Sequence, residues 1–91
     1  MINCSDEELL QLMKEDSQDA FRQIYHRHWE TLFVTAAKAL RGKQEAEDVL
    51  QDVFLSLWNR RKEIKIEQSL IAYLHTSVRY KVIHYIQKNG G

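Results

Sequence analysis

The 91-residue length predicts that residues 1–91 form a single domain with a small core, because a chain this short buries only about 60–65% of its unfolded surface. Hydrophobic residues make up 44% of the sequence and charged residues 29%, and neither a transmembrane span nor a secretory signal is present. These features are typical of a soluble globular protein and predict no direct membrane insertion. The lone Cys4 cannot form an internal disulfide, and no Cys/His spacing suggests zinc, so we expect a cytoplasmic protein.

The formal net charge of zero conceals an uneven distribution of charge along the chain. Residues 1–20 hold six acidic side chains and one basic side chain, a balance of −5, whereas residues 59–91 hold seven basic and two acidic side chains, a balance of +5. This asymmetry leaves room for a basic patch that contacts nucleic acid while another part of the chain contacts something else. From charge alone, attraction between the two ends within the fold explains it equally well.

The first two expected helices cover about residues 5–15 and about residues 17–41. Ser5 followed by Glu8 is a capping box, the signature of a helix N-terminus, and the residues between them are acidic, as the helix dipole favours. Ser and Asp between residues 16 and 19 can start a second helix. The residues expected to face the core then recur at steps of three or four: Phe21, Ile24, His28, Leu32, Ala36 and Leu40. Gly42 is expected to end this helix.

The third expected helix covers about residues 44–61, and one of its residues breaks the pattern. At about 100° per residue, its apolar side chains share one broad arc. They are Ala46, Val49, Leu50, Val53, Phe54, Leu57 and Trp58. Leu55 falls on the opposite side, beside Asp48, Gln51 and Asp52. Single exposed leucines are common, so its position among carboxylates raises a question that periodicity alone does not answer.

The last expected helix covers about residues 69–87, after a connector at residues 63–68 and with Ser69 as its cap. Its expected core side consists of Ile71, Leu74, Val78, Val82, Tyr85 and Ile86. Its opposite side consists of Tyr73, Thr76, Ser77, Tyr80, His84 and Gln87, with Lys81 and Lys88 at its edge. Tyrosines among hydroxyls and cations suit a surface where unstacked bases rest on rings. Alternatively, both tyrosines pack against the connector. Four helices without a strand predict an all-α fold, a compact bundle of about four helices.

The sequence gives no support for catalytic or metal chemistry. His26 and His28 are two residues apart on a helix and point in different directions, and the other two histidines, nine residues apart, lie on roughly opposite sides. No Glu-x-x-His pair and no glycine-rich phosphate loop occur. Asp48 and Asp52 lie one helical turn apart on what we expect to be an open face without a pocket. We therefore expect a protein that is no enzyme and that uses no cofactor, metal or small-molecule substrate.

Three segments together resemble region 2 of a bacterial RNA polymerase sigma factor of the sigma-70 family, most closely the extracytoplasmic-function class. The first, DSQDAFRQIYHRHWETLFVTAAKALRG, resembles the opening long helix of that family. The second, EAEDVLQDVFLSLWNRR, fits the family pattern E-D-x-x-Q-D/E-x-F-x-x-x-W and is the most specific of the three. The third, SLIAYLHTSVRYKVIHYI, resembles the helix that follows. The resemblance covers about residues 17–87 and implies a sigma factor region 2 fold.

The resemblance implies that the helix at residues 44–61 binds the clamp coiled coil of the largest subunit of core RNA polymerase. The matching positions are Asp48, Gln51, Asp52 and Leu55. On this hypothesis Leu55 is the apolar centre of a contact whose acidic rim meets basic residues of the polymerase.

The resemblance also implies that the last helix recognises and melts the −10 promoter element by holding the non-template single strand of DNA. The matching positions are Tyr73, Thr76, Ser77, Arg79, Tyr80, Lys81, His84 and Lys88. Many family members have asparagine where this chain has Tyr80, so the base preference of the family is not transferred.

The resemblance further implies transcription initiation and its regulation as the function. The family typically carries a second, helix-turn-helix domain, which is absent from this chain, so we expect a fragment of a longer protein that binds promoters weakly by itself. It also implies an anti-sigma factor as a partner. The alternative is a helical protein–protein interaction module that uses the acidic helix for docking and binds no DNA.

Overall fold

The computed structural model describes residues 4–89, which form four helices and, over this range, no strand. The helices are α1 (Asp6–Lys14), α2 (Gln18–Leu40), α3 (Lys43–Asn59) and α4 (Leu70–Asn89). The all-α fold class is therefore confirmed. Between Asn59 and Leu70 the chain forms turns and bends, so residues 63–68 form a connector, as predicted.

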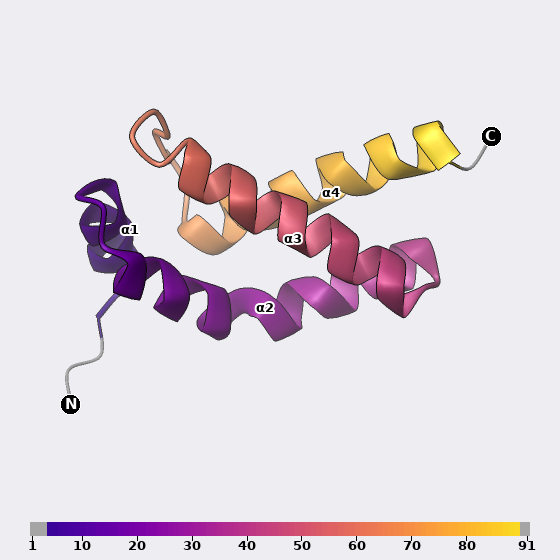
Figure 1. The fold of residues 1–91 in the computed structure, drawn as a ribbon, viewed down its shortest axis with the longest axis horizontal. Helices are drawn as coiled ribbons and strands as arrows, with labels where there is room; N and C mark the ends of the chain where they lie inside the picture. Colours follow the sequence, from indigo (N-terminus) through magenta and orange to yellow (C-terminus); the bar gives the residue numbers. More distant parts are fainter. Residues whose placement is uncertain (1–3, 90–91) are drawn as a thin grey trace.

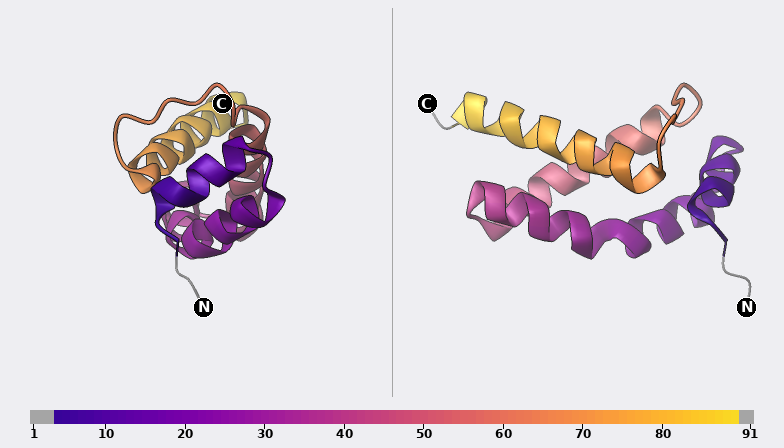
Figure 2. Two further views of the ribbon diagram at one scale, coloured as in Figure 1. Left: turned by 90° about the vertical axis from the view of Figure 1, so that its left-hand side faces the viewer. Right: turned by 180° about the vertical axis from the view of Figure 1, so that it is seen from behind.

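Helices α2, α3 and α4 run along the bundle, and α1 crosses one end of it (Figure 1). Figure 1 shows α2 and α3 as an antiparallel pair, with α4 returning in the direction of α2. α4 packs against both α2 and α3, whereas α1 packs mainly against α2 and also contacts α4. Figure 2 shows α1 lying across one end of the other helices. The domain measures 44 × 27 × 21 Å. α3 packs against α2 and α4, and its remaining side faces solvent.

The helix starts follow from local capping. The Ser5 backbone N–H donates to the Glu8 carboxylate at 2.8 Å, and the Glu8 backbone N–H donates to the Ser5 hydroxyl at 3.1 Å. These two hydrogen bonds, the first being the stronger influence, hold the pKa of Glu8 below its ordinary value. The Ser17 hydroxyl accepts from the Ala20 N–H at 3.1 Å, and the Ser69 hydroxyl accepts from the Ala72 N–H at 3.2 Å.

The end of α2 differs from the sequence-based expectation. Arg41, rather than Gly42, takes the left-handed conformation that ends the helix, with φ of 56°. Its N–H donates to the Ala37 carbonyl at 2.8 Å. Gly42 has φ of −155° and is the N-cap of α3. The connection between α2 and α3 is therefore so short that Gly42 belongs to the start of α3.

The core follows the predicted helical arcs except on α4, where Tyr73, expected on the opposite side, packs against the core cluster and Ile86 does not. All of the predicted apolar residues of α3 are buried except Trp58, which is half-buried. Ile86 was predicted on the core side of α4, but it is 47% exposed. Val82 is the last buried residue of α4 in the described part of the chain, and the helix then continues along the open end of the bundle (Figure 1). The prediction for Ile86 was wrong because helical periodicity does not show where a neighbouring helix ends.

A buried histidine ties α1 to α2. His28 is 9% exposed, and its Nε2 lies 3.0 Å and 3.1 Å from the two carboxylate oxygens of Asp6. Because an ionised carboxylate only accepts hydrogen bonds, Nε2 is the donor. Arg27 donates to the same carboxylate from Nη1 at 2.9 Å. The sequence places His28 in the core-facing stripe of α2, and the acidic partner from α1 makes that burial possible.

We expect Asp6→Ala to lower the free energy of unfolding by about 1–3 kcal/mol, because it leaves the buried His28 ring without its acceptor. Urea unfolding followed by circular dichroism measures the effect. Glu7→Ala, an exposed carboxylate in the same helical turn, is the matched control and should change stability by no more than about 0.5 kcal/mol. Equal effects of the two substitutions would contradict a structural role for the Asp6–His28 contact.

Candidate macromolecule-binding surfaces

The side of α3 that faces away from the core is an acidic ridge, defined by Asp48, Gln51, Asp52 and Leu55. All four side chains are exposed, and Leu55 is 58% exposed. The ridge combines one large apolar side chain with the acidic and amide groups around it. Such a surface can form a small contact with an apolar centre and a polar rim.

The outward face of α4 is basic and aromatic, and its residues differ in exposure. Thr76, Arg79, Tyr80, His84 and Lys88 are exposed, whereas Tyr73, Ser77 and Lys81 are half-buried. Tyr80 is 65% exposed, and its ring lies 5.3 Å from that of His84, one helical turn away. This exposed ring pair can stack on bases of a single strand.

Tyr73 lies between two hollows. One, of about 190 Å³, is lined by Tyr73 and Thr76 together with the connector residues Lys65, Ile66, Glu67 and Gln68. The other, of about 170 Å³, lies between α3 and α4. Tyr73 also packs against the core cluster. The alternative in which the tyrosines pack against the connector thus describes Tyr73 and does not describe the exposed Tyr80.

Arg60 is a residue that the sequence analysis did not place at this surface. It follows α3 and lines the hollow between α3 and α4 together with Ser56 on α3 and Tyr73, Tyr80 and Lys81 on α4, among other residues. Its guanidinium adds a second cation beside the α4 tyrosines. Its position four residues after Ser56 places both on one edge of the helix, but the sequence alone does not show that this edge faces α4.

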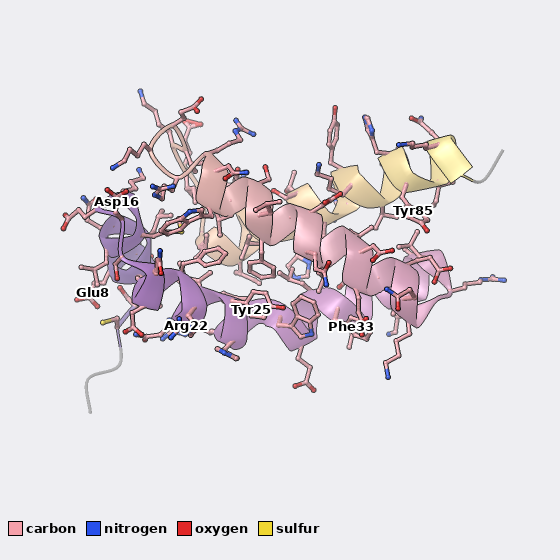
Figure 3. The ribbon with its side chains drawn as sticks, viewed as in Figure 1. Glu8, Asp16, Arg22, Tyr25, Phe33 and Tyr85 are labelled. Atoms are coloured by element: carbon pink, nitrogen blue, oxygen red, sulfur yellow. The ribbon has the colours of Figure 1, made fainter. Side chains whose placement is uncertain are left out.

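Asp48 and Asp52 are exposed, but the expectation that their face has no pocket was wrong. With Val49 they line a hollow of about 340 Å³ whose other side is formed by Lys81, His84, Tyr85 and Lys88 of α4. Figure 3 shows Tyr85 pointing from α4 toward the rest of the bundle. Among the described residues, no ion pair within 4.0 Å joins these aspartates to these lysines. The acidic ridge and the basic face of α4 are therefore neighbours across one groove.

Among residues 4–89 no cluster of three or more His, Cys, Asp or Glu side chains could hold a metal ion. Within the same range, no helix is both long enough and apolar enough to span a membrane. The acidic ridge of α3, with its exposed leucine, thus lies beside the basic and aromatic face of α4.

A comparison with protein families identifies the domain more closely. The family model described as Sigma-70 region 2 matches residues 24–91. Because the match covers most of the chain, this protein belongs to the sigma-70 region 2 family, whose domains are non-enzymatic parts of sigma factors and act in transcription initiation with core RNA polymerase and promoter DNA. Comparisons with curated proteins and with solved structures gave no match.

Proposed function

We propose that the acidic ridge of α3 binds the clamp coiled coil of core RNA polymerase. The exposure of Leu55 among Asp48, Gln51 and Asp52 is the observation that supports this assignment most directly. An apolar side chain at the centre of a polar rim is the usual arrangement of a binding hot spot. The carboxylates favour a basic partner and orient it by long-range attraction.

The outward face of α4 is proposed to hold the non-template single strand of the −10 element. Tyr80 presents an exposed ring for stacking. Arg60 and Lys81 line the same hollow as Tyr80 and carry cations for contact with phosphates. The two hollows on either side of Tyr73 offer room for bases that have left the stack. Thr76 and Ser77 line one hollow each and carry hydroxyl groups for base edges.

We expect Tyr80→Ala to weaken binding of a single-stranded oligonucleotide carrying the −10 sequence by about 1–3 kcal/mol, because it removes a stacking platform. Fluorescence anisotropy of a labelled oligonucleotide over a range of salt concentrations measures the effect. Tyr80→Phe keeps the ring and serves as the control, and it should bind like the natural protein. Unchanged binding by Tyr80→Ala would contradict the stacking role.

The second candidate function is a helical protein–protein interaction module that binds through the acidic ridge alone. Burial of part of Tyr73 favours it, since a half-buried ring offers less surface to a base. The same oligonucleotide titration separates the two functions. Sequence-selective binding supports promoter recognition, whereas no binding to any oligonucleotide at low salt supports the interaction module.

The narrower assignments also belong to this proposal. The pattern E-D-x-x-Q-D-x-F-x-x-x-W on α3 supports the extracytoplasmic-function class. That class implies a partner domain with a helix-turn-helix for the upstream promoter element, an anti-sigma factor that covers the two surfaces, and action in the cytoplasm. Purifying the natural protein with its bound partner and testing whether that partner blocks the Leu55 and Tyr80 surfaces would test the anti-sigma assignment.

A further inference from the structure

A separate hollow lies between the first half of α2 and the end of α3. It has a volume of about 450 Å³. Its lining is Gln18, Phe21, Arg22, Tyr25, His26 and Trp58. Figure 3 shows Tyr25 in the seam between α2 and α3, with Arg22 one turn before it on α2. Neither the acidic ridge nor the outward face of α4 contributes a residue to this hollow.

The aromatic rings in this hollow already have neighbours at their faces. Tyr25 stacks on Trp29 with ring centroids 4.9 Å apart and an interplanar angle of 24°. The guanidinium carbon of Arg61 lies 3.9 Å from the centroid of the Trp58 ring, and the Phe21 ring is tilted against Trp58 at 5.3 Å. The hollow therefore offers mainly ring edges, which accept a branched aliphatic or aromatic side chain better than they accept a stacked base.

The floor of the hollow is held in place before any partner arrives. Arg61 donates from Nη1 to the Trp58 carbonyl at 2.8 Å. It also donates from Nε and Nη2 to Asp16 at 3.0 Å and 2.9 Å. These hydrogen bonds, and a weaker contribution from Lys62, hold the pKa of Asp16 below its ordinary value. A fixed ring loses little conformational entropy on binding, so this floor is preorganised for a partner.

The basic side chains that line the hollow are Arg22 and His26, and both are exposed. No carboxylate contributes to the lining. Among the described residues Arg22 forms no ion pair, and the nearby Asp16 is already bound to Arg61 and Lys62. The charge of this hollow is thus opposite to that of the α3 ridge, so the two surfaces suit partners of opposite charge.

We propose that this hollow is a docking site for an acidic segment of a partner protein, with one large apolar side chain seated against the ring edges of Phe21, Tyr25 and Trp58. The carboxylates of the segment contact Arg22 and His26 at the rim. Gln18, Phe21 and Arg22 precede residue 24, where the family match begins, so the surface extends beyond the part of the chain that the match covers. It is a third surface, separate from those proposed for polymerase and promoter.

The experiment titrates the full 91-residue chain with three synthetic peptides and follows its ¹H–¹⁵N NMR spectrum. One peptide is acidic with a central leucine, the second is acidic with serine in place of that leucine, and the third is basic with the leucine. We expect the first peptide to shift the backbone amides of residues 21–26 and the indole N–H of Trp58. The second and third should bind at least about tenfold more weakly, since each lacks the anchor or the complementary charge.

Matched variants separate this site from the proposed polymerase surface. Arg22→Glu should weaken binding of the acidic leucine peptide about tenfold or more, whereas Lys38→Glu, the same charge reversal at an exposed position near the other end of α2, should not. Asp52→Arg should leave binding of this peptide intact. Binding of a clamp coiled-coil fragment should show the reverse pattern, so failure of one proposal is distinguishable from failure of the other.

Three results would overturn the docking site. The first is an equal response to all three peptides, or no response at low ionic strength, where salt does not screen the charge of Arg22. The second is a shift of the same amides by a single-stranded oligonucleotide that the acidic peptide does not compete away. The third is self-association of the chain at NMR concentrations that accounts for the shifts without added peptide.

Discussion

Leu55→Ala and Asp52→Arg are each expected to weaken binding to a clamp coiled-coil fragment of RNA polymerase by about 2 kcal/mol or more, roughly thirtyfold in Kd. Leu55 is the large apolar side chain exposed on the α3 ridge, and alanine removes most of the area that it would bury. Asp52→Arg replaces attraction by repulsion at a basic partner. Isothermal titration calorimetry with a purified clamp fragment measures both effects.

Two further readouts make this test specific. Val34→Ala removes an apolar side chain that is 45% exposed on α2, away from the ridge, and should leave clamp binding unchanged. Because Asp52 shares a hollow with Lys81 and Lys88, Asp52→Arg should preserve or strengthen oligonucleotide binding while it weakens clamp binding. Natural affinity for the clamp in both ridge variants would remove the basis for the polymerase-binding proposal.

Leu50→Ala is expected to lower the free energy of unfolding by about 2–5 kcal/mol, because a fully buried leucine leaves a cavity in a close-packed core. Leu50 lies on the same helix as Leu55, yet it is 0% exposed. A domain of this size has a total stability of only about 5–15 kcal/mol, so the loss is a large fraction of it. Chemical unfolding followed by far-UV circular dichroism measures the change.

Leu55→Ala is the matched control for Leu50→Ala, since the same chemical change is made five positions further along α3. It should alter the free energy of unfolding by no more than about 0.5 kcal/mol. The pair therefore separates the two faces of one helix: one substitution affects folding and the other affects binding. A large loss of stability in both variants would show that Leu55 contributes to the core and would contradict its assignment to a docking surface.

The helices and the inward face of α3 could be predicted from the sequence because both depend on local interactions. The serine caps at residues 5 and 69 lie at the predicted starts because each cap satisfies backbone N–H groups within one turn of itself. The exposure of Leu55 follows from the angle of 100° between successive residues and needs no knowledge of the partner helices. Periodicity failed only where the neighbouring helix was needed, as at Ile86.

The hollows beside the two proposed surfaces could not be predicted from the sequence, because they depend on how the helices pack against one another. Arg60 shares a hollow with Tyr80, and Asp52 shares one with Lys81, only because α3 and α4 adopt one particular crossing and register. The partly buried Asp6–His28 contact joins residues 22 positions apart, and Arg61 contacts Asp16 across 45 positions. No local rule links such residues.

The sequence by itself thus determined four amphipathic helices, their starts, and which side of α3 faces solvent, because each of these is decided within a few turns of backbone. Only the tertiary structure decided which outward residues share a groove: an acidic ridge next to the basic face of α4, and an aromatic basic hollow between α2 and the end of α3. The reason is that the azimuth and offset of one helix against another are fixed by the packing of the whole core, to which every helix contributes.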